Sequence, residues 1–392
     1  MSEWRLADLP FFDARHREVA DRLKEWVCPV DPLRESEDLR TDSRAIALSL
    51  ARHGLLDLVM PQADSGRADL RSICIARESL AYRHVLSDTI FAMQGIGSAP
   101  IWMHGSAAQR ERYLEPIRAG RAIAAFALSE PGTGSDVSSM ATAAKRRGDH
   151  YVLNGEKAWI SNAGIADHYV VVARTGEGPG SRGLSAFMID AGTPGLTVGQ
   201  PIELVAPHPL ANLTFKDCAI PASQMLGEPG QGFKVAMATF DIFRASVGAA
   251  GVGIARRAIS ETLQRVTARR LFGRLMSEIE GVQTKLADMS VDIELASLAV
   301  YQAAWLHDER RIRISRESAI AKLVGSEAAF RVVDNAVQLW GGMGVQRGTV
   351  IEQLYREVRP MRIYEGASEI QKIVIARSLL ATKGGSPASP RT

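Results

Sequence analysis

A carboxylate near the C-terminal end of the chain has the type and position of a catalytic base. Glu365 lies in the segment YEGASEI, residues 364–370, directly before a run with helical spacing. An acid at the start of a helix is common, because the helix dipole stabilises it by about 0.3–1 kcal/mol. It could instead act as a general base, provided that burial raises its pKa against the same dipole. The residues alone leave both interpretations open.

A glycine-rich segment earlier in the chain could bind a polar ring edge or a phosphate. Residues 127–136, ALSEPGTGSD, are typical of a strand end that passes into a tight turn. Exposed backbone amides in such a turn, with the hydroxyls of Ser129 and Ser135, suit either ligand. A plain β-turn is the alternative. The segment is neither a Walker loop, since no Gly-Lys-Ser/Thr follows, nor a Rossmann turn.

Two other segments could contact a flat ligand. Trp159 and Ser161 share a strand end, where the indole could stack on a planar cofactor and the hydroxyl could donate a hydrogen bond. A tryptophan is more often simply part of the core. Residues 338–344, QLWGGMG, follow a long helix and form either a glycine C-cap or a place where bare backbone approaches a flat or anionic group.

The elements that must position these segments follow an α, β, α order. Residues 1–122 show helical periodicity, residues 123–232 are rich in strands and turns, and residues 233–382 form long helices before a tail at 383–392. Asn154-Gly155 predicts a hairpin between strands at 150–153 and 157–160. The small residues of 248–251, GAAG, would let a second helix approach closely.

Composition excludes several classes of protein. The chain has 392 residues, 46% of them hydrophobic and 23% charged, which is ordinary for a globular protein. A net charge of +3 is too balanced for an obligate nucleic-acid binder. Cys28, Cys74 and Cys218 are too far apart for a zinc site or a disulfide scaffold. The longest stretch without Asp, Glu, Lys or Arg, Thr89 to Gln109, is too interrupted for a membrane span, and the N-terminus has no signal peptide. We therefore expect a soluble, cytoplasmic protein.

In combination and in this order, the segments resemble the flavin-dependent acyl-CoA dehydrogenases over residues 10 to 381. The resemblance rests on 128–136, 269–273 (RRLFG), 338–344 and 364–371. It implies an α+β fold with an N-terminal helical domain, a middle β-barrel-like domain and a C-terminal four-helix bundle. It also implies FAD as cofactor, an acyl-CoA substrate and an electron-transfer flavoprotein as acceptor. A homo-oligomer, a tetramer by similarity, completes the expectation, with no metal, nucleic acid or membrane as partner.

The resemblance also implies a role for each matching residue. Glu365 corresponds to the base that takes the α-proton while the β-hydrogen leaves as a hydride to flavin N5, which yields the trans-2-enoyl thioester. Substrate contacts are implied for Ser135, Asp241, Arg244 and Gly366. Arg269, Phe272 and the turn at Gln338 would reach the FAD of a neighbouring subunit. The full set implied for FAD is Phe126, Leu128, Ser129, Gly134, Ser135, Trp159, Ile160, Ser161, Arg269, Phe272, Gln338, Gly341, Gly342, Ala367 and Glu369.

Several positions depart from the family pattern. Glu280 stands where a glutamine usually contacts FAD, with Gln283 one turn further on, and Ala367 replaces a threonine. Residues 205–210, VAPHPL, replace a loop usually richer in Gly, Arg and Ser, and His208 in it is interpreted as an ordinary loop residue rather than a catalyst. Phe243 could shorten the acyl cavity and favour a compact acyl group, or could simply pack between helices.

Two alternative functions keep the same fold. One alternative is a desulfinase-like relative, and Glu365 argues against it, because the desulfinating relatives lack that base. The other is an oxidase that uses oxygen, which is harder to exclude. A flavoprotein associated with nucleic acid is a remote third alternative, because the relatives of that kind carry an additional basic C-terminal domain, which we do not expect here.

Overall fold

The computed structural model describes residues 9–31, 38–61 and 67–381, so the predicted tail at 383–392 lies outside the described part. The chain divides into two compact units. The helical unit comprises the described parts of Met1–Glu25, Leu70–Val85 and Arg244–Thr392, and the sheet unit comprises those of Trp26–Asp69 and Leu86–Phe243. The boundary between them falls inside the helix α6 (Gly232–Ala268).

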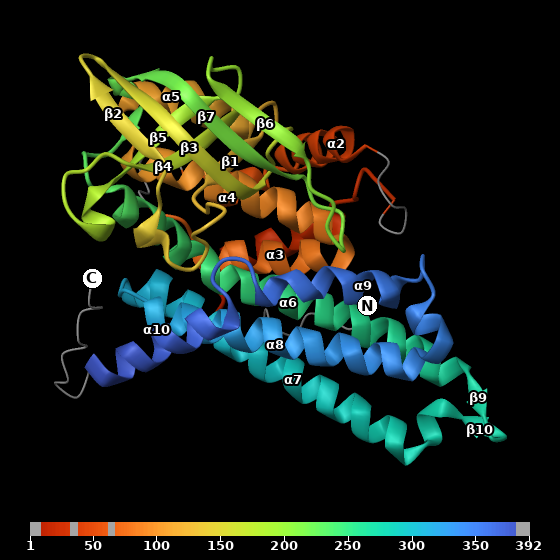
Figure 1. The fold of residues 1–392 in the computed structure, drawn as a ribbon. Helices are drawn as coiled ribbons and strands as arrows, with labels where there is room; N and C mark the ends of the chain where they lie inside the picture. Colours follow the sequence, from red (N-terminus) through yellow and green to blue (C-terminus); the bar gives the residue numbers. More distant parts are fainter. Residues whose placement is uncertain (1–8, 32–37, 62–66, 382–392) are drawn as a thin grey trace. The chain divides into compact units, whose positions relative to one another are not determined.

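The sheet unit is built on a mixed sheet (Figure 1). Within the described residues the sheet has eight strands in the order β6-β7-β3-β2-β4-β5-β8, and β1 lies parallel to β4, with Ala124 opposite His168. All four residues of β1 are buried. The strands are β1 (Ala124–Ala127), β2 (Ala143–Arg147), β3 (His150–Ser161), β4 (His168–Arg174), β5 (Leu184–Asp190), β6 (Leu196–Pro201), β7 (Leu210–Pro221) and β8 (Met225–Leu226).

The hairpin predicted at Asn154-Gly155 is wrong. β3 runs through both residues, and its pairing with β7 shifts in register between Leu153 and Gly155, which marks a β-bulge. Gly155 has φ +144°, and a Cβ there would lie 2.6 Å from the Cα of Thr142. The glycine is therefore required for a bulge against a neighbouring segment and not for a turn. The actual hairpin joins β2 to β3 through Gly148 and Asp149.

Helices α2 (Leu39–Arg52), α4 (Val85–His104) and α5 (Ala107–Arg118) accompany the sheet. The uncharged stretch that begins at Thr89 forms most of the buried helix α4. Among the described helices, only α6 is long and apolar enough to cross a membrane, and 78% of its most apolar window is buried inside the protein, as in a core helix. Short 3-10 turns complete the unit: Leu56–Leu58, Val137–Ser139, Gly180–Gly183 and Ala222–Gln224.

The helical unit is a bundle in which the long helices run side by side (Figure 1). A Cβ on Gly325 of α8 would lie 2.5 Å from the Cα of Gly248 on α6, so the two backbones nearly touch where the small-residue stretch predicts a close approach. The elements of this unit are α1 (Ala14–Glu25), α3 (Leu70–Arg83), most of α6, β9 (Arg270–Leu271), β10 (Arg274–Leu275), α7 (Glu280–Trp305), α8 (Ser315–Trp340), α9 (Val350–Val358) and α10 (Ser368–Ala381), with short helical turns at Met276–Glu278, Leu306–Arg310, Gly341–Val345 and Arg359–Arg362.

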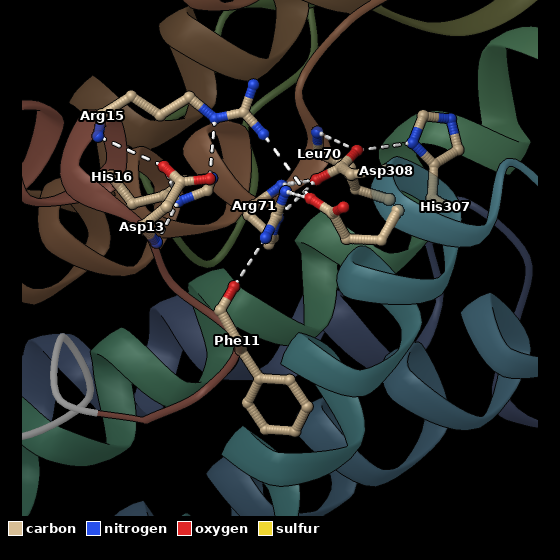
Figure 2. A network of polar contacts seen from close by, with 9 residues as sticks. Phe11, Asp13, Arg15, His16, Leu70, Arg71, His307 and Asp308 are labelled. Carbon is tan, nitrogen blue, oxygen red and sulfur yellow. Dashed lines mark hydrogen bonds and ion pairs between the residues drawn. The ribbon is translucent and has the colours of Figure 1, made fainter.

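A buried ion pair ties α3 to the π-helical turn Leu306–Arg310 (Figure 2). The guanidinium Nε of Arg71 lies 3.0 Å from Oδ2 of Asp308, and both side chains are almost completely buried. The same arginine donates to the backbone carbonyl of Phe11 at 2.7 Å. Asp308 also accepts from the backbone amides of Leu70 and Arg71, so its charge is compensated on several sides.

Candidate functional site

The glycine-rich turn after β1 is anchored by a buried ion pair. Nζ of Lys157 lies 2.9 Å from Oε1 of Glu130 and 3.0 Å from the carbonyl oxygen of Leu128. The Glu130 carboxylate also accepts from the backbone amides of Ala141 and Thr142, at 2.6 and 2.9 Å. Burial lowers the pKa of Lys157 to about 8, against the attraction of Glu130. The end of β1 is thus fixed by contacts that the isolated motif does not reveal.

The turn itself leaves backbone uncovered. Cβ atoms placed on Gly132 or Gly134 would meet nothing within 4 Å, so these peptides are accessible to a ligand. Ser129 is held to β3, because its carbonyl accepts from the amide of Ala158 at 2.9 Å. Phe126 and Leu128 are buried, and Phe126 packs edge-on against Phe240 with ring centroids 5.6 Å apart. The segment combines an apolar wall with open amides.

Trp159 is not a core residue. Its side chain is 60% exposed, and its backbone has φ +58°, a conformation that bulky residues rarely adopt. The amide of Trp159 donates to Oδ1 of Asn212 at 3.1 Å, which helps to hold this conformation. Of the two interpretations of Trp159, the alternative that it is simply part of the core is therefore wrong, and the indole is available to a flat ligand. Ile160 next to it is buried.

Ser161 contacts His208, which its sequence context predicts to be an ordinary loop residue. Nε2 of His208 lies 2.7 Å from Oγ of Ser161. Burial lowers the pKa of His208 to about 4, so the imidazole is neutral at physiological pH. The two residues are 47 positions apart, and only the pairing of β3 with β7 brings them together.

In the helical unit, Glu365 occupies a strained turn before α10. Its φ is +51°, and Gly366 follows with φ +90°. Two side chains hold the carbonyl oxygen of Gly366: Nε2 of Gln371 at 2.7 Å and Nζ of Lys322 at 2.9 Å. Lys322 lies on α8 and is fully buried. Burial lowers its pKa to about 8, opposed first by the negative charge of Glu365.

The start of α10 has a separate anchor on α8. Glu327 accepts from the hydroxyl of Ser368 at 2.6 Å and from Nε of Arg362 at 2.9 Å. Burial opposes ionisation of Glu327, but these hydrogen bonds hold its pKa below the usual value. Ala367 caps this helix without a hydroxyl, and its carbonyl accepts from the amide of Gln371. Glu369 lies in the first turn of α10 and contributes negative charge near Lys322.

A third group of predicted residues lies at another end of the same unit. Arg265 donates to the carbonyl of Trp340 at 3.1 Å and lies over its indole, which joins the C-terminal ends of α6 and α8. Arg269 follows Ala268, the last residue of α6, and Gln338 lies in the last turn of α8. Because α8 rises 1.5 Å per residue, Gln338 is about 24 Å from Lys322 along the helix. Gly341 and Gly342 have open space where a Cβ would lie.

Phe272 stands at the tip of the β9–β10 hairpin beside this group. Its side chain is 95% exposed and its φ is +52°. Glu280 is the first residue of α7, where the helix dipole favours an acid. Gln283 uses its amide to donate to the carbonyl of Ser277 at 2.9 Å, so the residue that could replace the usual glutamine is engaged with its own loop.

The implied substrate residues on α6 fall on either side of the boundary between the units. Asp241 is half-buried in the sheet unit, and Arg244 is buried at the start of the helical unit. The positive charge of Arg244 acts on Lys322 and contributes to its low pKa. Ser135 lies in the open turn after β1. Within the described residues, no three or more His, Cys, Asp or Glu side chains gather as a metal site would require.

Strained backbone marks three of the predicted positions. Among the described residues other than glycine, φ is positive at six, and three of these are Trp159, Phe272 and Glu365. Such conformations cost about 1–3 kcal/mol each and concentrate at functional sites. The other three are Asn162, Asp217 and Arg311.

This arrangement defines an acyl-CoA dehydrogenase fold, and comparison with known proteins places the chain in that family. The profile described as "Acyl-CoA dehydrogenase, N-terminal domain" matches residues 13–121, the "middle domain" matches 125–218 and the "C-terminal domain" matches 230–380. The chain belongs to the acyl-CoA dehydrogenase family.

Individual relatives agree with this placement. The chain is 40% identical to the mitochondrial short-chain specific acyl-CoA dehydrogenase of Mus musculus, over 83% of this chain and 80% of that protein. Butyryl-CoA dehydrogenase from Megasphaera elsdenii is 31% identical, with a TM-score of 0.86 over 94% of this chain and 99% of the other. PigA with FAD and proline is 28% identical, with a TM-score of 0.86 over 94% and 98%.

The family uses FAD, and the residues present fit such a group. In the sheet unit, an exposed indole, the Ser161 hydroxyl two residues further along β3 and the open glycine peptides after β1 are groups suited to a flat, polar-edged ring. In the helical unit, an exposed phenyl ring, Arg269 and two uncovered glycines suit an adenine and a pyrophosphate.

Proposed function

We propose that the protein dehydrogenates an acyl-CoA thioester between its α- and β-carbons, with Glu365 as the base. The observation that carries this proposal is the turn at Glu365, whose strained backbone is held from α8 and α10 by Lys322 and Gln371. A carboxylate kept in such a conformation by two buried side chains supports a role beyond that of a helix-start acid. Family membership supplies the reaction class.

In the proposed reaction, this chain's residues bind, orient and move one proton. Glu365 removes the α-proton of the thioester, whose carbonyl acidifies it, and the backbone amide of Glu365 donates to the developing enolate. Bound FAD supplies the acceptor for the hydride that leaves the β-carbon. Trp159 would cover a face of the ring and Ser161 would bond its edge, while Asp241 and Arg244 would each contact the acyl-CoA. The product is the trans-2-enoyl thioester.

The proposed acyl group is short or compact. Support comes from the Mus musculus relative, which is short-chain specific, and from the butyryl-CoA dehydrogenase neighbour. Phe243 is fully buried, and its ring lies against Gly95 of α4, so at least part of the ring serves helix packing. Anaerobic bleaching of the flavin across straight, branched and cyclic acyl-CoAs tests this preference. Efficient bleaching by palmitoyl-CoA would contradict it.

The proposed working form is a homo-oligomer, a tetramer by similarity, that passes electrons to an electron-transfer flavoprotein in the cytoplasm. Gln338 lies about 24 Å from Lys322 along α8. This separation favours contact of the residues around Gln338 with a second FAD, different from the one that reacts near Glu365. α7 and α10 also expose apolar side chains, as expected for helices that contact another subunit. A monomer by light scattering that retains FAD and turns over would refute this, and rapid peroxide release in air would favour the oxidase alternative. The exposed residues are Val291, Leu295, Leu298, Ile373, Leu379 and Leu380.

Replacement of Glu365 by Gln tests the central claim. The holoenzyme should keep FAD and bind acyl-CoA, while anaerobic flavin reduction should slow about 10²–10⁴-fold, the usual contribution of a general base. In Glu365→Asp the rate of flavin reduction should fall about 10²-fold, because the aspartate carboxylate ends about 1 Å short of the position of the glutamate carboxylate. Glu352→Gln on α9 is the control. A reduction rate for Glu365→Gln within about tenfold of wild type would place the base elsewhere.

A further inference from the structure

We propose that His208 is a positioning residue for Ser161 and, through that hydroxyl, tunes the redox equilibrium of the FAD bound beside it. The proposal rests on the proposed function, since it requires a flavin edge at Ser161. It assigns a role to a residue that belongs to this chain's own version of the loop between β6 and β7.

The contact is built into the sheet. Ser161 is the last residue of β3 and pairs with Leu210, the first residue of β7. The amide of Asn162 donates to the carbonyl of Pro209 at 2.8 Å, which fixes the backbone next to His208. Pro207 and Pro209 flank the histidine and restrict its backbone, because each proline ring locks φ. The 2.7 Å between Nε2 and Oγ is thus set by the backbone on both sides.

The chemistry of the pair follows from its neutral state. A neutral imidazole offers one N–H donor and one lone-pair acceptor, and a hydroxyl can donate once and accept twice. The contact can therefore run from the Ser161 hydroxyl to Nε2, or from Nε2–H to Oγ. In the first case Ser161 can only accept from a ligand atom, and in the second it can also donate.

This choice matters beside a flavin. Ser161 would meet a ring nitrogen that accepts a hydrogen bond when oxidised and donates one when reduced. When Ser161 accepts from the reduced ring, its own hydrogen needs an acceptor, and Nε2 of His208 lies in place to provide it. Ser161 is half-buried in the chain alone, and a hydroxyl that a bound ring would cover is costly to leave without that partner. His208 therefore stabilises the reduced form relative to the oxidised form.

The test uses the FAD-loaded protein and its two-electron midpoint potential. His208→Leu removes the acceptor, and we expect the equilibrium to shift about tenfold toward oxidised flavin, which for two electrons is about 30 mV to lower potential. His208→Gln reaches about as far with an amide oxygen and should restore most of the potential, whereas the shorter His208→Asn should not. FAD affinity and the oxidised absorption spectrum should remain close to wild type.

A double-mutant cycle identifies the route. Combined with Ser161→Ala, His208→Leu should cause no further shift, because its effect passes through the Ser161 hydroxyl. His150→Leu is the control: it lies at the other end of β3, about 36 Å from Ser161 at 3.3 Å per residue.

Three results would overturn the proposal. One is a His208→Leu potential within about twofold, or about 10 mV, of wild type. Another is an undiminished His208→Leu shift when Ser161 is already Ala. If His208→Leu fails to fold, the third result comes from the two amide variants: a midpoint potential equal to that of wild type in both His208→Gln and His208→Asn would also overturn the proposal. A protein that binds no FAD would instead refute the proposed function.

Discussion

Lys322→Met removes one buried ammonium and leaves a side chain of similar length in its place. In the structure Nζ donates to the carbonyl oxygen of Gly366 at 2.9 Å, directly after Glu365. Gln371 still reaches that oxygen at 2.7 Å, so the turn keeps one of these two donors. The substitution therefore tests whether Lys322 is needed to position Glu365.

The expected effect on stability is small because two terms oppose each other. Burial lowers the pKa of Lys322 from 10.5 to about 8. That shift of about 2.5 units means that the buried charge costs about 3 kcal/mol at neutral pH. Methionine removes this cost but also the hydrogen bond of a charged donor, worth about 1.5–3 kcal/mol. We expect the free energy of unfolding of the variant to lie within about 1–2 kcal/mol of wild type.

The expected effect on the reaction is much larger. Glu365 has a positive φ, which is strained for a residue other than glycine, so we expect the turn to relax when an anchor is lost. A displacement of about 1 Å at a reacting group can cost about 10²-fold. We expect flavin reduction at saturating acyl-CoA to slow about 10–100-fold, with the acyl-CoA dissociation constant changed less than about threefold, the pattern of an interaction needed in the transition state.

The assay is anaerobic stopped-flow reduction of the FAD-loaded variant over a range of acyl-CoA concentrations. Lys285→Met is the matched control, since Lys285 bonds Asn335 on α8 at 2.8 Å, and Asn335 lies about 20 Å along the helix from Lys322. Lys322→Arg should recover part of the rate. A Lys322→Met rate within about threefold of wild type would refute the positioning role, because such a difference is under 1 kcal/mol in barrier.

The same pair of proteins gives a pH prediction. Between about pH 8 and 10.5 the folded protein loses the Lys322 proton while the unfolded chain keeps it. The unfolded state then binds more protons, so the stability of wild type rises with pH relative to Lys322→Met, by up to about 3 kcal/mol. Urea unfolding of both proteins at several pH values measures the difference. A difference independent of pH would show that Lys322 titrates normally.

Three further substitutions have expected outcomes in urea unfolding. Lys157→Met breaks the buried ion pair behind the glycine-rich turn and should destabilise the protein by about 3–5 kcal/mol, with weaker FAD retention; unchanged stability would mean that the pair contributes nothing net. Asp308→Asn removes one carboxylate partner of the buried Arg71 guanidinium and leaves Glu309 as another, so it should cost about 1.5–3 kcal/mol, the usual worth of a hydrogen bond to a charged group, whereas a cost below about 1 kcal/mol would be typical of an exposed pair. Gly95→Ala places a Cβ 2.5 Å from the ring of Phe243 and should cost about 1–3 kcal/mol, and wild-type stability would show that the ring moves aside freely.

The parts of the fold that depend on local pattern could be predicted from the sequence. The apolar spacing of α7 and α8 is continuous over their lengths, and the small residues around Gly248 indicate a close helix contact that the structure shows at Gly325. The order of the site segments was also sufficient to identify the family, because four motifs in sequence are far more specific than any one of them.

The wrong prediction concerns a segment whose conformation depends on distant partners. Asn154-Gly155 is a local signal for a hairpin, but the segment is fixed by β7 and Thr142, so it becomes a bulge. Tertiary pairing here overrides a local preference worth about 1 kcal/mol or less. For Trp159 the residue type alone left two interpretations open, and its positive φ and exposed indole exclude the one in which it is simply part of the core.

The residues that sequence reasoning missed act across long separations. Lys322 is 44 residues from the carbonyl it holds, and His208 is 47 from the hydroxyl it contacts. One signal was present for Lys322, since a lysine within the small, apolar run of α8 is unusual unless it has a buried partner. For His208 the only signal was its place between two prolines in a loop that departs from the family.

Phe272 is the clearest example of a site residue whose type is not explained by the fold of its own chain. The β9–β10 hairpin turns through Phe272 and Gly273, with φ +52° and +80°, a two-residue turn that favours Asn-Gly. A phenylalanine there is strained, and with 95% of its side chain exposed it gains almost nothing from burial within its own chain. Both the positive φ and the exposure of the apolar ring to water therefore disfavour phenylalanine at this position. Contact with the FAD of a neighbouring subunit, as proposed above, would cover this ring and so account for a residue that its own chain does not favour.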